Sequence, residues 1–153
     1  MANRNTQGFG LVAAGTLGST PATSGQGKYK IDAGSTTTIY NGAAVASASG
    51  YIVDGQTTDA PILGVLNGIF YNAATTLKPT FANFYKQPIT PANSEDIDAF
   101  VFDNPQQQYV VATDAAVTQA GFLETYDMNT SAGSDTTGKS SATLDIGDTS
   151  ADA

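Results

Sequence analysis

The chain has 153 residues and a net charge of −8, with 6 basic and 14 acidic residues, so nucleic acid and anionic membrane surfaces are unfavourable partners. It contains no cysteine and no histidine, which excludes a disulfide framework, a thiolate metal site and Ser–His–Asp or Cys–His catalysis. Its length suits one compact domain, or one small domain with extensions.

The first 27 residues have neither a helical nor a strand period. Six glycines lie between Gly8 and Gly27, and Thr20-Pro21 interrupts the segment. A stretch of small residues with few apolar side chains cannot bury enough surface to fold alone. We therefore expect residues 1–27 to form an extended N-terminal arm.

The next part of the chain alternates short β-type stretches with turn residues. Turns are expected at Gly34-Ser35, Asn41-Gly42, Ser49-Gly50 and Asp54-Gly55. The strands predicted between them are 28–33, 36–40, 43–48 and 51–53.

Residues 61–71 are the most apolar stretch and predict a buried strand. Gly64 and Asn67-Gly68 indicate a tight bend or a bulge within it. Further strands are predicted at 97–102, 108–113, 122–128 and 142–146, with a single helical turn at 115–121.

Short strands spaced about ten residues apart are typical of an all-β fold, either a small antiparallel β-barrel or a sandwich. The predicted organisation is an arm at 1–27, a β-rich body at 28–146 and a short, flexible acidic C-terminal tail at 147–153.

Charge is distributed unevenly along the chain. Residues 1–94 hold five basic and three acidic residues, whereas residues 95–153 hold one basic and eleven acidic residues. This split would let copies attract one another head to tail, and the simpler interpretation is a solvated acidic segment.

The densest carboxylate group is Glu95-Asp96-Ile97-Asp98. Asp96 and Asp98 would share one strand face, so a bound cation or a metal-dependent hydrolase centre is an alternative to a solvated turn. A glycosidase pair normally flanks a cleft lined by aromatic platforms, and the chain has no tryptophan. We expect no enzyme activity, no catalytic or metal-binding residue and no cofactor.

Aromatic residues concentrate between positions 70 and 85. They are Phe70, Tyr71, Phe81, Phe84 and Tyr85. Such side chains usually build the core of a small β domain, which is the interpretation favoured here. The alternative is a platform for a sugar or a partner.

Three stretches resemble virion proteins of marine tailed phages, such as cyanophages and pelagiphages. They are NRNTQGFGLVAAGTLGSTPATSGQGKYKI, GVLNGIFYNAATTLKPTFANFYKQ and VFDNPQQQYVVATDAA. The pattern of Asp103, Pro105, Gln106–Gln108 and Tyr109–Val111 is similar to that of phage capsid decoration (cement) proteins. Thr137-Gly138-Lys139-Ser140 and Leu144-Asp145 complete the likeness, whereas Val117–Gly121 departs from the family pattern.

The resemblance implies a β-barrel-like structural protein on the outer surface of the virion. It would bind the phage major capsid protein across neighbouring subunits and stabilise the head, as a homo-oligomer, either dimer or trimer. The residues expected to contact the capsid from the arm are Arg4, Phe9, Leu11, Val12 and Leu17. The alternative is a tail- or fibre-associated module that binds host glycan through exposed tyrosines such as Tyr71 and Tyr85.

Overall fold

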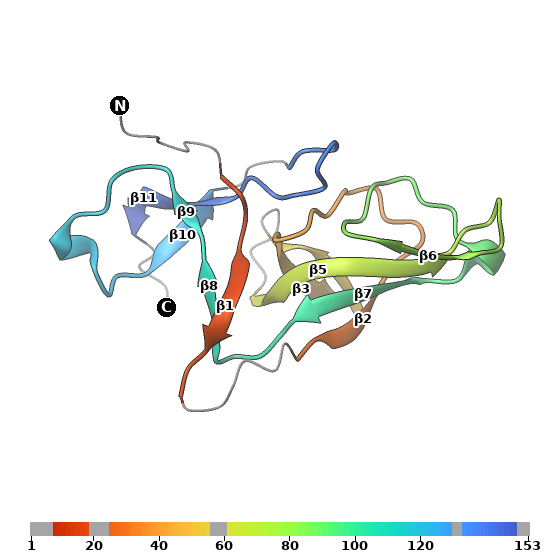
Figure 1. Cartoon of the computed structure of the whole chain (residues 1–153), viewed down its shortest axis with the longest axis horizontal. Helices are drawn as coiled ribbons and strands as arrows, with labels where there is room; N and C mark the ends of the chain where they lie inside the picture. The colour runs from red at the N-terminus through yellow and green to blue at the C-terminus, as the bar shows by residue number, and fades with distance from the viewer. Residues whose placement is uncertain (1–7, 19–24, 56–60, 130–132, 150–153) are drawn as a thin grey trace.

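The computed structural model describes residues 8–18, 25–55, 61–129 and 133–149. Within these residues the fold is all-β, with two short 3₁₀ turns, η2 (Ala92–Ser94) and η3 (Gln119–Gly121), and no α-helix (Figure 1). None of the helical segments described is long and apolar enough to cross a membrane.

The largest unit is a six-stranded antiparallel sheet with the order β2-β7-β5-β3-β4 and β6 paired to β5. Its strands are β2 (Gly27–Ile31), β3 (Ala44–Ala48), β4 (Tyr51–Asp54), β5 (Ile62–Asn72), β6 (Pro79–Ala82) and β7 (Ile97–Phe102). The long strand β5 is central, because β7 pairs along one edge while β3 and β6 share the other.

Two glycine-containing sites shape this sheet as the sequence predicted. The β3–β4 connection places Ser49 and Gly50 at φ 51° and 85°, the two positive φ values of a type I′ hairpin. In β5 the register against β7 shifts between Leu66 and Gly68, so the predicted bulge at Asn67-Gly68 is confirmed.

The core lies on one face of the six-stranded sheet. Alternation along β7 turns Ile97, Ala99 and Val101 inward, and all three are fully buried. The edge strands β2 and β4 approach each other, yet no ladder joins them among the described residues. A sandwich therefore fits the structure, and the described residues do not show a closed barrel.

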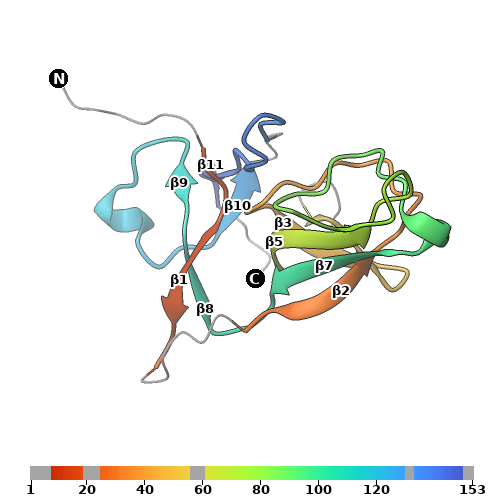
Figure 2. The same cartoon turned by 45° about the vertical axis from the view of Figure 1, so that its right-hand side comes forward.

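Two smaller sheets lie beside this unit (Figures 1 and 2). Strand β1 (Val12–Thr16) pairs antiparallel with β8 (Gln107–Val110) in a two-stranded sheet, here called the ribbon. Strand β11 (Thr143–Thr149) pairs antiparallel with β10 (Tyr126–Asn129) and parallel with β9 (Ala112–Thr113).

The segment 8–11, just before β1, passes close to two distant parts of the chain, at Gly42 and at Ser140. The backbone N–H of Leu11 donates to the carbonyl of Gly42 at 2.8 Å. A Cβ on Gly10, which has φ 73°, would approach both the Gly42 carbonyl at 2.7 Å and the Ser140 side chain at 2.9 Å. Only glycine allows the chain to pass this closely.

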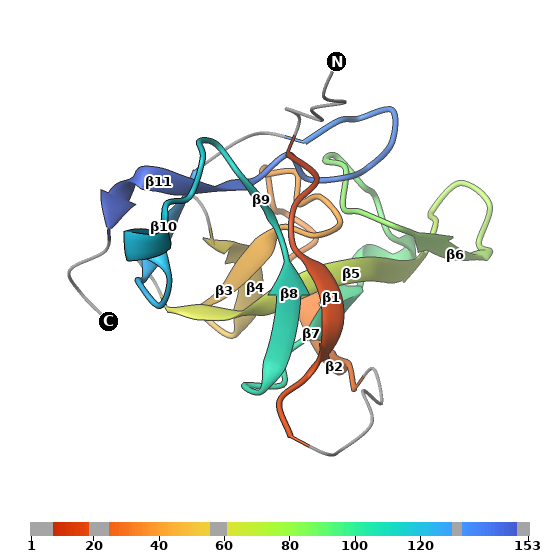
Figure 3. The same ribbon diagram turned by 60° about the vertical axis from the view of Figure 1, so that its left-hand side comes forward.

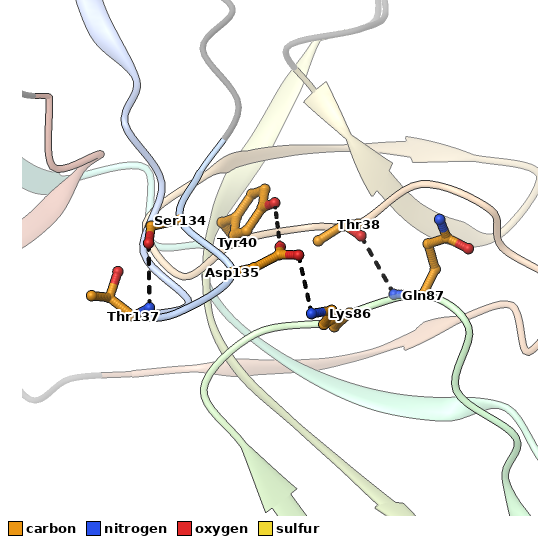
Figure 4. A network of polar contacts seen from close by, with 7 residues as sticks. All are labelled: Thr38, Tyr40, Lys86, Gln87, Ser134, Asp135 and Thr137. Carbon is orange, nitrogen blue, oxygen red and sulfur yellow. Dashed lines mark hydrogen bonds and ion pairs between the residues drawn. The ribbon is translucent and has the colours of Figure 1, made fainter.

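A polar network holds the loop at 133–140 against the six-stranded unit (Figure 4). The Tyr40 hydroxyl donates to Asp135 Oδ1 at 2.7 Å, and Lys86 Nζ lies 3.0 Å from Asp135 Oδ2. The Tyr40 ring also stacks on Phe84, with centroids 5.6 Å apart. Hydrogen bonding to Tyr40 and then to Lys86 holds the pKa of Asp135 below its usual value.

Several boundaries differ from the sequence-based expectation. Residues 36–40 form no strand, and Ile39 makes an isolated bridge to Tyr85 instead. Strand β2 begins at Gly27, and β11 continues through 147–149, where a tail was expected; residues 150–153 lie outside the described part. The expectation of an extended arm is wrong for residues 8–18, because β1 pairs with β8 along its backbone. The local sequence of β1 did not predict this pairing.

Candidate docking site on the β1–β8 ribbon

The stretch DNPQQQYVV forms the turn after β7 and then β8, the second strand of the ribbon. Asn104 organises the turn after β7: its carbonyl accepts from the Gln107 N–H, and its side-chain oxygen accepts from the Gln106 N–H, both at 2.9 Å. Gln107 Nε2 then reaches across the ribbon to the carbonyl of Gly15 at 2.7 Å. These contacts order the turn before β8 and hold β8 against β1.

The two faces of the ribbon have different surroundings. On the inner face Tyr109 donates its hydroxyl to the carbonyl of Phe102 at 3.0 Å, and burial raises its pKa. On the outer face Val12 and Val110 are direct cross-strand partners, and they are 47% and 53% exposed. Exposed β-branched pairs of this kind form a ready contact surface for a partner protein.

The edges of the ribbon are a second feature of this surface. In the described part of the chain each ribbon strand has a ladder with one neighbour only. A two-stranded sheet is marginally stable in water by itself, and an open edge can accept a further strand from a partner. Figure 3 shows β1 and β8 side by side in front of the six-stranded sheet.

The loop between β9 and β10 adds further exposed apolar side chains. They are Val117, Phe122 and Leu123. Leu123 is also held at φ 72°, a conformation that costs a leucine about 1 kcal/mol or more. A leucine that is both exposed and strained contributes little to folding, so this loop supplies apolar surface beyond the ribbon.

The predicted contact residues separate into three groups. Arg4 lies outside the described residues. Phe9 and Leu11 are half-buried where the chain passes Gly42, whereas Val12 and Leu17 are exposed. Val110 was missed, although its place in the alternating run Gln108–Val110 could have marked it as sharing a face with an exposed residue.

The carboxylates proposed as a cation site lie in different surroundings. Asp98 sits between two ammonium groups, with Lys28 Nζ at 2.7 Å and Lys30 Nζ at 2.6 Å from its oxygens. Burial would raise its pKa, but the two lysines outweigh that effect and lower it. Asp96 instead accepts a hydrogen bond from the Tyr51 hydroxyl at 3.2 Å.

This pairing removes Asp98 from the role of an available cation ligand. Within the described residues, no three His, Cys, Asp or Glu side chains gather as a metal-binding group would. The two carboxylates therefore do not form a shared site in this structure.

The aromatic cluster divides between core and surface. Tyr85 is fully buried and donates its hydroxyl to the carbonyl of Ser35 at 2.8 Å. Tyr71 packs against the same core. Tyr85 therefore cannot provide the exposed platform expected under the glycan hypothesis, and Tyr71 is only partly exposed. Phe81, in contrast, is largely exposed.

Comparison of the chain with protein families, with curated proteins and with solved structures gives no significant match.

Proposed function

We propose that this chain is a structural virion protein that decorates the outer surface of a phage capsid. It binds across neighbouring subunits of the major capsid protein and stabilises the head. The ribbon is the element that docks, with Val12 and Val110 as its central contacts and Leu17 at its end.

The observation that carries the proposal is the outer face of the ribbon. It combines an exposed valine pair with two edges that lack a ladder partner in the described part of the chain. The residues that build it, from Asp103 to Val111, are those on which the likeness to decoration proteins rests. A partner strand added to such an edge gains backbone hydrogen bonds, and the valines add apolar burial.

A contact of this size is weak for a single copy. Fully burying a valine contributes about 1.5–3 kcal/mol, part of which is lost to the cost of association. A capsid lattice, however, presents the same surface many times. A dimer or trimer of the chain engages several copies at once, and this avidity raises the overall affinity by orders of magnitude.

The test uses expanded heads that lack the decoration protein, prepared from the phage that encodes the chain. The purified chain is mixed with these heads, and bound protein is measured by co-sedimentation and by imaging. The double variant Val12→Glu/Val110→Glu places two charges on the docking face. Leu77→Glu is the control, because Leu77 is also an exposed apolar residue, at 73%, but lies in the connection before β6.

The wild type and Leu77→Glu are expected to saturate the heads, while the double variant loses at least about tenfold in affinity, equivalent to about 1.4 kcal/mol. Circular dichroism checks that all three remain folded. Saturation by the double variant would exclude the ribbon as the docking element. Failure of the wild type to bind would overturn the proposed function itself.

A further inference from the structure

The outer face of the six-stranded sheet carries a second feature, separate from the ribbon. Strands β6, β5 and β7 lie side by side in Figure 1, and alternation turns Phe81, Phe70 and Phe100 away from the core. The Phe81 ring contacts Phe70 at a centroid distance of 4.8 Å and stacks near-parallel to Phe100 at 6.3 Å. Phe81 is 74% exposed, so most of its ring is open to a ligand.

A glycine leaves space next to these rings. Gly68 pairs directly with Phe100 across the β5–β7 ladder and presents no side chain on this face. A Cβ at this position would come within 3.2 Å of the Ala82 carbonyl. The result is an open hollow of about 460 Å³, a volume within the usual range for small-molecule sites.

The polar groups around the hollow are amides. Its lining includes Gln26, Asn67, Asn83, Gly68, Phe81 and Phe100. Asn83 donates to the carbonyl of Thr137 at 2.9 Å, which fixes its side chain and leaves the amide oxygen as an acceptor. Within the described residues no hydrogen bond engages the side chains of Gln26 and Asn67, so each offers both donors and an acceptor.

This combination selects a particular ligand chemistry. No acidic or basic side chain lines the hollow within the described part of the chain, so nothing there favours a charged ligand. A sugar ring presents an apolar C–H face, which packs on an aromatic ring, and neighbouring hydroxyls, each of which needs both a donor and an acceptor. Aromatic rings with adjacent amides supply both.

We propose that the hollow over Gly68 binds a neutral pyranose unit of a glycan. The sugar packs its C–H face on Phe81 and places its hydroxyls among the amides of Gln26, Asn67 and Asn83. The hollow shares no residue with the ribbon, so sugar binding can be tested separately from capsid binding.

The test is a titration of the full chain, labelled with ¹⁵N, with the methyl glycosides of glucose, galactose, mannose and N-acetylglucosamine. Amide shifts are expected to saturate at millimolar sugar and to centre on Gly68, Ala82 and Phe100. A trisaccharide of the best monosaccharide is measured in parallel. Tighter binding of the trisaccharide identifies a glycan site, and equal affinity identifies a site for a single sugar unit, which would overturn the glycan part of the proposal.

Three variants locate the site. Phe81→Ala removes the stacking surface and is expected to weaken binding at least tenfold. Leu77→Ala, at a residue 73% exposed in the preceding turn, is the matched control and is expected to bind as the wild type does. Gly68→Ala fills the base of the hollow and is expected to abolish binding, and its unfolding midpoint shows whether the sheet is intact.

Three further results would overturn the whole proposal. The first is the absence of saturable shifts with every one of these sugars. The second is wild-type affinity in Phe81→Ala. The third is shifts at Gly68 and Phe100 that follow protein concentration and not sugar, since the hollow would then be a contact between copies of the chain.

Discussion

The six-stranded sheet and the ribbon with its following loop use apolar side chains in opposite ways. Among the described residues, every fully buried large apolar side chain lies between Ile31 and Val101. The exposed ones include Val12 and Leu17 at the ribbon, Val110 on its second strand, and Val117, Phe122 and Leu123 in the loop. The six-stranded unit therefore holds the buried core, although it also exposes Ile62, Leu77 and Phe81, whereas the ribbon and its loop contribute exposed apolar side chains and no large buried one among the described residues.

This difference separates stability from recognition. Burial of apolar area stabilises a fold in rough proportion to the area removed from water, so the sheet carries most of the folding free energy. The ribbon gives up part of that stabilisation and keeps an apolar face, and in the described part of the chain each of its strands has a ladder with one neighbour only. A substitution in the sheet should therefore affect the whole chain, whereas one in the ribbon should act locally.

The largest effect is expected from Ile69→Ala in the centre of β5. Ile69 is fully buried, so truncation removes apolar contacts and leaves a cavity that costs about 2–5 kcal/mol. Ile62→Ala, on the same strand but exposed, should cost less than about 1 kcal/mol. Urea unfolding measures both. Equal losses would show that β5 is not divided between core and surface as described.

Gly138→Ala tests how closely the loop at 133–140 packs against the six-stranded unit. Gly138 is buried with φ 68°, and a Cβ would clash with Phe84 and the Asn83 amide, for an expected cost of about 1–3 kcal/mol. Gly50→Ala is the control, since Gly50 has a similar φ of 85° but open space around it, leaving only the backbone cost of about 1 kcal/mol. Thermal unfolding of the two variants separates packing from backbone strain, and a smaller loss in Gly138→Ala would contradict the tight fit.

Asp98 gives the sheet a pH dependence with a definite sign. Because its folded pKa is lowered, its ion pairs stabilise the protein above the unfolded pKa of about 3.9. That contribution is lost as the pH falls through the folded value, so stability should decline below about pH 4.

Asp98→Asn is expected to lower the free energy of unfolding at neutral pH by about 1 kcal/mol, between the values typical of surface and buried pairs. It should also flatten the decline at acid pH, whereas the exposed control Asp127→Asn should keep the wild-type slope. Urea midpoints between pH 7 and pH 3 provide the measurement. An unchanged slope in Asp98→Asn would mean that other groups set the acid response.

The smallest global effect is expected from Gln107→Ala. The change removes the side-chain hydrogen bonds to the carbonyls of Gly15 and Gln108. Global stability should fall by less than about 1 kcal/mol, while amide hydrogen exchange accelerates in β1 and β8 and not in β5 or β7. Uniform acceleration across all four strands would show that ribbon and sheet open as one unit.

Local patterns in the sequence predicted the sheet well. The alternation of Ile97–Phe102, the hairpin at Ser49-Gly50 and the bulge at Asn67-Gly68 depend on neighbouring residues, and all three are present in the structure. The run TTTIY failed for the opposite reason. Its β-branched residues favour a strand, but among the described residues Ile39 has a single bridge partner, Tyr85.

Features set by distant residues could not be predicted. The β2–β7 register brings Lys30 opposite Asp98, which turns an apparently solvated carboxylate into the centre of two ion pairs. Strand β1 has no period of its own, and its conformation depends on β8. The exposed hollow depends equally on pairing, since Gly68 and Phe100 meet only across the β5–β7 ladder.

The pairing of β1 with β8 also means that β1 is synthesised well before the strand with which it pairs. Gly15 and the glutamine that reaches it, Gln107, are 92 positions apart in the chain. At about 5–20 residues per second, the first strand leaves the ribosome on the order of ten seconds before its partner does. A short strand rich in alanine and glycine suits that delay, because it offers newly made neighbouring chains little apolar surface on which to aggregate.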